Sequence, residues 1–200
     1  MKESLRFERK DEIVLVDSIM SVEAARAQNP HLPCPEKILE QQEVLFERYL
    51  TPDGKLHEGQ IVVHRELAED VTRLFERIRA EGFPVASVIP LADRKFKWDD
   101  EQSMMRNNTS GFNYRPIAGT NRLSRHAEGR AIDINPWWNP MVRTVVPGER
   151  VIVEPEGAHY DPRVPGTIVR GDFITEFLKQ RGWKWGGEWT SLKDYQHFEK

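Results

Sequence analysis

The sequence predicts one α+β domain, in which a small antiparallel sheet is flanked by helices. The 200 residues are enough for one domain with a substantial core and too few for two domains of ordinary size. Six tryptophans and nine phenylalanines supply large side chains for that core. Strand-like and helix-like segments do not alternate regularly along the chain, so a doubly wound parallel sheet is not expected.

The N-terminal part is expected to form an arm, residues 1–35, that packs on a domain formed by residues 36–200. Residues 13–16 favour a short strand within this arm. Residues 29–35 contain three prolines, which predict an extended and stiffened connector to the domain.

The first elements of the domain are predicted from hydrophobic spacing. Residues 36–50 carry apolar side chains at helical spacing and predict an amphipathic helix, which ends at the turn-forming residues 51–54. Residues 61–63 favour a strand. Residues 66–80 form the clearest helical pattern, and residues 85–91 favour a buried strand. The helical stripe of that second helix consists of Leu67, Val71, Leu74, Phe75 and Ile78.

The remaining elements are less regular. The polar residues 93–109 predict a surface loop, in which Met104 and Met105 anchor to the core. Residues 142–153 predict a β-hairpin with Pro147 and Gly148 at its turn. Residues 154–169 are rich in proline and glycine and predict a loop near the mouth of a site. Residues 172–180 predict a short helix that begins near Asp172 and ends at Gly182.

Composition excludes several classes of protein. The net charge is -3 and 30% of residues are charged, so no overall basic field favours nucleic acid as a partner. The single Cys34 excludes an internal disulfide and a cysteine-based zinc finger. No stretch reaches the roughly 18 apolar residues of a transmembrane helix. The first ten residues lack the apolar run of a secretory signal, so none is expected there.

Two separate segments combine into a candidate metal site. The first contains His126 and, seven positions later, Asp133, with a turn expected at Gly129. The strand pattern that follows the turn places Asp133 on the face opposite its apolar neighbours. The second segment contains Asp194 and, three positions later, His197. Two histidines and one carboxylate with a fourth position open is the ligand count of a catalytic zinc site, although these ligand types also suit manganese or iron.

These segments resemble a known family of zinc peptidases. The pattern Ser-x-His-x-x-Gly-x-Ala-x-Asp at residues 124–133, followed by Asp-x-x-His-Phe at 194–198, is similar to the VanY-like D-alanyl-D-alanine carboxypeptidases and the L-alanyl-D-glutamate endopeptidases. Both belong to the LAS group of lysostaphin, D-Ala-D-Ala metallopeptidases and hedgehog. Residues 110–115 and 182–189 resemble the same family, and the resemblance covers roughly residues 58–200. It implies a LAS/hedgehog-like zinc peptidase fold.

The resemblance also implies a role for individual residues. His126, Asp133 and His197 would bind Zn²⁺, and Asp194 would act as the catalytic base toward its water. Arg115 would bind substrate or stabilise the oxyanion in catalysis, and Ser124 would bind substrate at the border of the metal. Glu188 is a second candidate for the base, although its Gly-Gly-Glu-Trp context favours a structural acid. Four further histidines and three further aromatic residues are expected to be structural: His31, His57, His64, His159, Tyr160, Trp185 and Trp189.

The expected function is hydrolysis of peptide bonds in the stem peptides of bacterial peptidoglycan. The resemblance implies either L-alanyl-D-glutamate cleavage or removal of terminal D-alanine, and the Asp-x-x-His-Phe form favours the former. A periplasmic, secreted or cell-wall location follows from that function, and phage-type release is the alternative because no signal is expected. Two other functions stay open: a metal-bearing module that binds the wall or a partner without catalysis, and a phage lysis enzyme whose residues 1–35 bind the wall. Asp194 argues against the non-catalytic module, since a binding module needs no base.

Overall fold

The computed structural model describes residues 13–146 and 150–200. The expectation about a signal in the first ten residues, and the predicted hairpin turn at Pro147 and Gly148, lie outside these ranges. Within them, no helix is long and apolar enough to cross a membrane.

A three-stranded sheet forms the N-terminal half of the fold, in the order β1-β3-β2. Strands β2 (Gln42–Leu50) and β3 (Leu56–His64) pair antiparallel along nine residues each. They are joined at the predicted turn, where the Thr51 N–H donates to the carbonyl of Lys55 over 3.0 Å. Strand β1 (Val14–Val16) pairs in parallel with β3. The short strand predicted from residues 13–16 is therefore confirmed.

The predicted helix over residues 36–50 is wrong beyond its first turn. Only α2 (Glu36–Leu39) is helical, and β2 begins at Gln42. The apolar residues of this segment are spaced as in an amphipathic helix. The same spacing also fits a strand that packs against other residues on both of its faces. Leu45 and Tyr49 point into the core under one face, while Val44 belongs to a cluster on the other. Pairing with β3 therefore overrides the local helical pattern.

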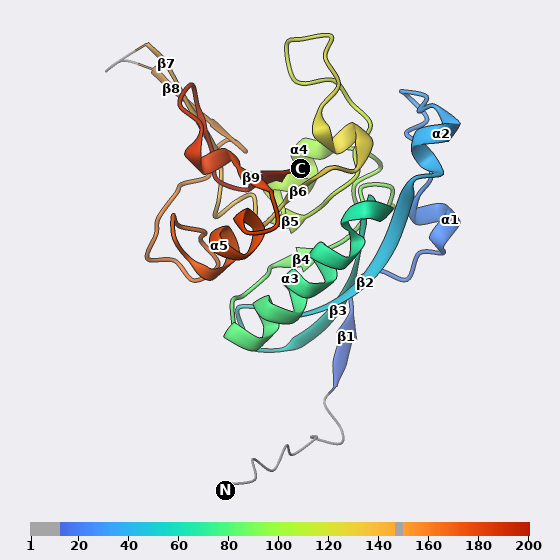
Figure 1. Ribbon diagram of the computed structural model, residues 1–200, viewed down its shortest axis with the longest axis horizontal. Helices are drawn as coiled ribbons and strands as arrows, with labels where there is room; N and C mark the ends of the chain where they lie inside the picture. The colour runs from blue at the N-terminus through green and yellow to red at the C-terminus, as the bar shows by residue number, and fades with distance from the viewer. Residues whose placement is uncertain (1–12, 147–149) are drawn as a thin grey trace, which may run out of the picture.

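Helix α3 (Ala68–Glu81) covers one face of this sheet (Figure 1). It follows the short helix η1 (Arg65–Leu67) and ends at Gly82, whose φ of 69° is left-handed. Its four apolar residues Val71, Leu74, Phe75 and Ile78 are fully buried. The helix predicted from residues 66–80 is thus confirmed, together with its apolar stripe.

The other face of the sheet is covered by part of the predicted N-terminal arm. Helix α1 (Val22–Ala25) buries Ala25 in a cluster with Cys34, Val44 and Val62. The Cys34 side chain is buried there, which raises the pKa of its thiol to about 11. Residues 13–35 thus pack on the rest of the chain, while the division of the domain at residue 35 stays a prediction.

The C-terminal half adds three small sheets and two helices to the same core. The strands are β4 (Ser87–Val88), β5 (Asn108–Thr109), β6 (Ala131–Asp133), β7 (Met141–Val146), β8 (Arg150–Glu154), β9 (Lys184–Trp185), β10 (Lys193–Asp194) and β11 (His197–Glu199). The helices are α4 (Asp100–Met105) and α5 (Phe173–Lys179), with short helices η2 (Arg125–Glu128) and η3 (Gly186–Glu188). The sheet orders are β6-β11-β9, β10-β7-β8 and β4-β5. Ile132, Leu178 and Phe198 share one buried cluster with α3, so both halves form a single domain.

Several expectations for this half are corrected. Residues 93–109 are not a simple surface loop, because they contain α4 and β5, and Asn108 and Thr109 are buried. Met105 is 45% exposed, so it does not anchor to the core. Only Ser87 and Val88 of the expected strand at 85–91 pair with another strand. The hairpin of β7 and β8 and the helix α5 are confirmed, and Figure 1 shows the hairpin projecting from the body.

The α+β class is confirmed. The sheet content differs from the prediction, since the described residues form four small sheets that include two parallel pairs. The narrower expectation, a LAS/hedgehog-like fold, stays a prediction.

Candidate metal centre

The pairing of β6 with β11 brings two of the predicted ligands together. In this antiparallel register Asp133 lies directly opposite His197. The flanking pairs are joined by hydrogen bonds, from Ile134 N–H to the Gln196 carbonyl and from Lys200 N–H to the Arg130 carbonyl. Because hydrogen-bonded pairs alternate along an antiparallel ladder, Asp133 and His197 form a non-hydrogen-bonded pair, in which side chains lie closest.

His126 reaches the same point from η2. The helix begins at Ser124, whose hydroxyl oxygen accepts a hydrogen bond from the His126 N–H at 3.3 Å. It ends at Gly129, which has a φ of 68°, and a Cβ at this position would come within 1.9 Å of Gln42 Oε1. This tight left-handed turn needs glycine, and it returns the chain into β6 so that Asp133 lies beside His126.

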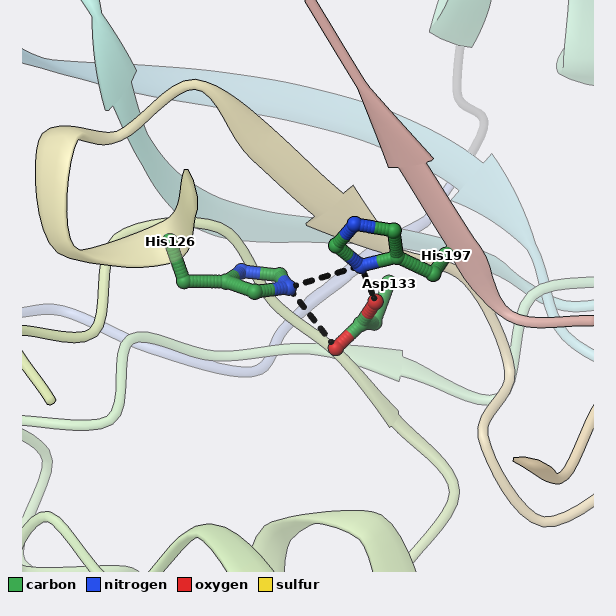
Figure 2. Close-up of side chains that lie close together, drawn as sticks. All are labelled: His126, Asp133 and His197. Atoms are coloured by element: carbon green, nitrogen blue, oxygen red, sulfur yellow. Dashed lines mark hydrogen bonds and ion pairs between the residues drawn. The ribbon is translucent and has the colours of Figure 1, made fainter. Parts of the chain in front are cut away.

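The three side chains converge on one point, as Figure 2 shows. His126 Nε2 lies 3.1 Å from His197 Nδ1 and 3.2 Å from Asp133 Oδ2. His197 Nδ1 lies 3.1 Å from Asp133 Oδ1. All three residues are at least 93% buried. The structure therefore brings together the three residues that the sequence predicted as ligands, although 64 positions separate Asp133 from His197.

The hydrogen bonds around the two rings indicate which nitrogen of each carries a proton. On the side away from the cluster, His126 Nδ1 lies 2.7 Å from the carbonyl oxygen of Gly111, which can only accept. Likewise, His197 Nε2 lies 3.3 Å from the carboxylate of Glu199. Each neutral ring with its proton on that outer nitrogen presents a lone pair to the other ring. With both rings in these neutral forms, the centre would present two lone-pair nitrogens and a carboxylate to a cation.

The charges of the centre reinforce one another. Burial alone would lower the pKa of His197, but hydrogen bonds to Asp133 and Glu199 outweigh it and raise the pKa to about 10. Burial alone would raise the pKa of Asp133, but the two histidines outweigh it and hold that pKa far below its usual value. The metal-free centre thus attracts a cation, here a proton.

Asp194 lies next to this centre on β10. Although the residue is partly exposed, its Oδ1 atom is buried and accepts no hydrogen bond from the described residues. Burial raises the pKa of this carboxyl above its usual value. Strand β10 is held by pairing with β7, where Asp194 lies opposite Met141. The predicted base is therefore a carboxylate with an unused acceptor oxygen.

A cleft of about 1170 Å³ opens over the centre. His126, Asp133, Asp194 and His197 all line it, so the centre lies at the wall of this cleft. Its walls come from the segment at residues 115–125 and from the hairpin of β7 and β8. This volume is large enough for an extended peptide of several residues.

The two other predicted site residues also line the cleft. Arg115 Nε lies 2.8 Å from the carboxylate of Asp100, at the start of α4, so Arg115 is engaged in an ion pair at the cleft wall. Ser124 is 7% exposed and its hydroxyl caps η2. Its observed contact is therefore to the backbone of His126.

Other expectations meet mixed outcomes. Trp185 is buried in the core as expected, but Trp189 lines the cleft with its ring centroid 5.3 Å from that of His197. Glu188 lies outside the cleft and pairs with Arg170 at 3.5 Å, in keeping with a structural acid. Tyr160 is a packing residue, stacked on Tyr195 with ring centroids 3.6 Å apart.

Sequence reasoning missed the cleft-lining residues of the hairpin, Met141, Arg143 and Glu154. No motif marks them, because their place in the cleft depends on the pairing of β7 with β10. It also missed Glu199. Glu199 follows His197 by two positions, and in a strand such side chains lie on the same face. This spacing could have identified Glu199 as a neighbour of His197.

The donor set fits a divalent metal ion. Two imidazole nitrogens and one carboxylate are the ligands of many catalytic zinc sites. Within the described residues these three are the one group of three or more potential ligands placed closely enough to share an ion. Asp194, whose Oδ1 is buried and has no hydrogen-bond partner among the described residues, lines the same cleft.

Comparison with known proteins agrees with this geometry. The model of a family described as D-alanyl-D-alanine carboxypeptidase matches residues 118–200. A search of curated proteins and a search of solved structures gave no match. Ser124, His126, Asp133, Asp194 and His197 lie within the matched segment, whereas Arg115 lies just before it. The segment that carries the converging side chains thus has the sequence pattern of the D-alanyl-D-alanine carboxypeptidase family, and the resemblance drawn from its motifs is confirmed over residues 118–200.

Proposed function

We propose that this chain is a zinc-dependent peptidase that hydrolyses peptide bonds in the stem peptides of bacterial peptidoglycan. One observation carries the proposal: two imidazole nitrogens and a carboxylate converge at an open cleft, with a second carboxylate beside them, one oxygen of which has no hydrogen-bond partner among the described residues. The family match over residues 118–200 supports a peptidase. A periplasmic or cell-wall location follows from that substrate.

His126, Asp133 and His197 would hold the metal through Nε2, a carboxylate oxygen and Nδ1. When bound there, zinc supplies Lewis acidity toward a carbonyl group and toward water. The chain contributes the rigidity of the site: Gly111 and Glu199 fix the two rings, and the strand register fixes Asp133 against His197. Three protein ligands leave a fourth position open to the cleft.

Asp194 would accept a proton from the attacking water and deliver it to the leaving amine. Its Oδ1 has no competing donor among the described residues, so that oxygen can receive the proton without breaking an existing bond. General bases of this kind contribute roughly 10²–10⁴-fold to the rate. A non-catalytic binding module would gain nothing from a buried carboxylate held in this way.

Arg115 would bind a substrate carboxylate or stabilise the negative charge that develops on the carbonyl oxygen. The ion pair with Asp100 engages its Nε, and a hydrogen bond to the Pro116 carbonyl at 3.4 Å engages Nη1, so Nη2 would make such a contact. Ser124 would border the substrate, while its cap on η2 keeps His126 in place.

Two peptide bonds are candidates. The description of the matched family favours removal of a terminal D-alanine, and the Asp-x-x-His-Phe form favours cleavage between L-alanine and D-glutamate. Digestion of purified muropeptides, analysed by mass spectrometry with and without a chelator, distinguishes them. Loss of one C-terminal alanine identifies the carboxypeptidase, and separation of the peptide after its first L-alanine identifies the endopeptidase.

The same experiment tests the function as a whole. We expect cleavage that stops on chelation and returns when zinc is added back. If zinc binds but no peptide bond is cleaved under any condition, the metal-bearing binding module replaces the enzyme. If neither zinc binding nor cleavage is found, both functions are excluded.

A further inference from the structure

We propose that Glu199 is a positioning residue that orients His197 for metal binding and strengthens the hold of the centre on its ion. This inference rests on the proposed metal centre and adds a residue to it. The observation behind it is the contact of 3.3 Å between Glu199 Oε2 and His197 Nε2, the ring nitrogen opposite the one in the cluster.

The strand geometry makes this contact a consequence of the fold. Glu199 and His197 are two residues apart in β11, so their side chains leave the same face of the strand. On the neighbouring strand β6, Ala131 lies opposite Glu199, just as Asp133 lies opposite His197. Ala131 is small and fully buried, so it leaves the space beside the His197 ring to the Glu199 side chain.

The choice of partner distinguishes this role from an ordinary surface ion pair. Lys184 of β9 lies opposite Glu199 on its other side, where a cross-strand ion pair would be expected. Among the ion pairs of the described residues, however, Glu199 pairs with His197 and not with Lys184.

The chemical effect follows from the tautomer. A carboxylate that accepts the Nε2 proton keeps the lone pair of His197 on Nδ1, where it faces His126 Nε2 and Asp133. It also makes the ring a stronger donor toward a cation and prevents the ring from rotating away. Loss of such an outer partner typically weakens metal affinity by roughly 10–100-fold.

The test is the zinc affinity of the full chain, measured by competition with a chromophoric chelator after the metal has been removed. We expect Glu199→Ala to weaken zinc binding by roughly 10–100-fold. Glu199→Gln keeps an oxygen that can accept the Nε2 proton, so we expect it to recover part of the loss. Thermal unfolding of the metal-free variants shows whether each is folded, and Glu199→Gln preserves the test if Glu199→Ala is not.

Two control variants separate positioning from general effects. Glu128→Gln removes the same charge from another cleft-lining glutamate, which pairs with Arg125 at 3.0 Å. Lys184→Ala removes the cross-strand neighbour of Glu199. Both should bind zinc within about twofold of the wild type, because exposed charges interact weakly through solvent.

Each outcome bears on the proposal. Unchanged zinc affinity in both Glu199 variants, with normal binding by the wild type, would refute the positioning role and leave the metal centre intact. Equal losses in Glu199→Gln and Glu128→Gln would also refute it, because overall charge would then explain the effect. Absence of zinc binding by the wild type would overturn the centre itself, and this role with it.

Discussion

Two places in this molecule bring a histidine against an aspartate, and they are built differently. In the first, on the N-terminal sheet, Asp17 contacts His57 Nδ1 at 2.9 Å and accepts a hydrogen bond from the Tyr49 hydroxyl. In the second, Asp133 contacts both His126 and His197. Judged by the His–Asp contact alone, both are candidate sites.

The two places differ in their balance of donors and acceptors. The Asp17 carboxylate has one donor for each oxygen, and the Tyr49 hydroxyl in turn accepts from the Val88 N–H at 3.1 Å. Both oxygens of Asp17, the Tyr49 hydroxyl and His57 Nδ1 thus have partners within the chain. The Asp133 cluster instead places two ring nitrogens and a carboxylate together, next to the unpartnered oxygen of Asp194.

This difference indicates which buried histidine belongs to a site. A balanced network rigidifies the fold and has no need of a ligand. An excess of acceptors is costly unless a cation enters, and here the excess faces a cleft. The expectation that His57 is structural agrees with this balance, although no spacing in the sequence indicates that Asp17 is its partner.

Replacing each of the two aspartates by alanine, in separate variants, tests the comparison and has the largest expected effect. Asp133→Ala removes a direct ligand, so zinc affinity should fall by more than about 100-fold, beyond the loss typical of an outer partner, and cleavage should disappear. Asp17→Ala should lower the free energy of unfolding and leave zinc affinity unchanged. Chelator competition and urea unfolding measure the two quantities, and equal zinc loss in both variants would contradict the distinction.

Asp194 supplies the next largest effect. We expect Asp194→Ala to lower turnover of muropeptides by roughly 10²–10⁴-fold, because the proton acceptor is lost while the three ligands remain. Zinc content should stay at the wild-type level. The matched control is Glu188→Ala, which removes the second candidate base outside the cleft. Turnover that falls with Glu188→Ala and persists in Asp194→Ala would reverse the two roles.

Tyr49→Phe sharpens the description of the balanced cluster. The change removes one hydroxyl and leaves an oxygen of Asp17 and the N–H of Val88 without a partner. We expect the free energy of unfolding to fall by about 3 kcal/mol, since each unsatisfied group costs about 1–3 kcal/mol. Urea unfolding measures this loss. A change in zinc affinity of the same variant would show that the two clusters are coupled.

A third buried carboxylate, that of Glu47, has one hydrogen-bond partner. Its substitution is expected to have the smallest effect on stability. Glu47 is 5% exposed and accepts one hydrogen bond, from the Thr72 hydroxyl at 2.6 Å. Burial raises the pKa of the Glu47 carboxyl to about 7, from its usual value of 4.5. Folding therefore favours the protonated form, and stability should fall as the pH rises from about 4.5 to 7.

Glu47→Gln removes this ionisation. Its free energy of unfolding should match that of the wild type near pH 4.5 and exceed it above pH 7 by on the order of 2 kcal/mol. Thermal or urea unfolding at several pH values measures the difference. An equal difference at all pH values would mean that Glu47 does not titrate in this range.

The sequence predicted the local parts of the candidate site better than the long-range ones. His126 and Asp133 are joined by one turn, so the spacing and Gly129 were sufficient to place them together. The meeting of Asp133 with His197 depends on the β6–β11 register, and only the family resemblance pointed to it. The ion pair between Arg115 and Asp100, and the approach of Trp189 to His197, left no trace in the spacing of motifs.

The fold shows the same division. Helix α3 was predictable because its apolar stripe and its terminal glycine agree with each other. Strand β2 was not, because its apolar residues fit a helix as well as a strand until the pairing with β3 is known. Residues 100–109 were mistaken for a loop because their polar side chains are satisfied internally, as when Asn108 bonds to Ile89 and Ser103. Burial of polar residues of this kind depends on partners that sequence patterns do not reveal.

The most direct test of the metal centre is a crystal structure of the zinc-loaded protein with anomalous scattering recorded at the zinc edge. We predict one strong peak per chain, bound by His126 Nε2, a carboxylate oxygen of Asp133 and His197 Nδ1, with the fourth position facing the cleft. A peak at another place, a fourth protein ligand that closes the site, or no peak in zinc-saturated crystals would contradict the account.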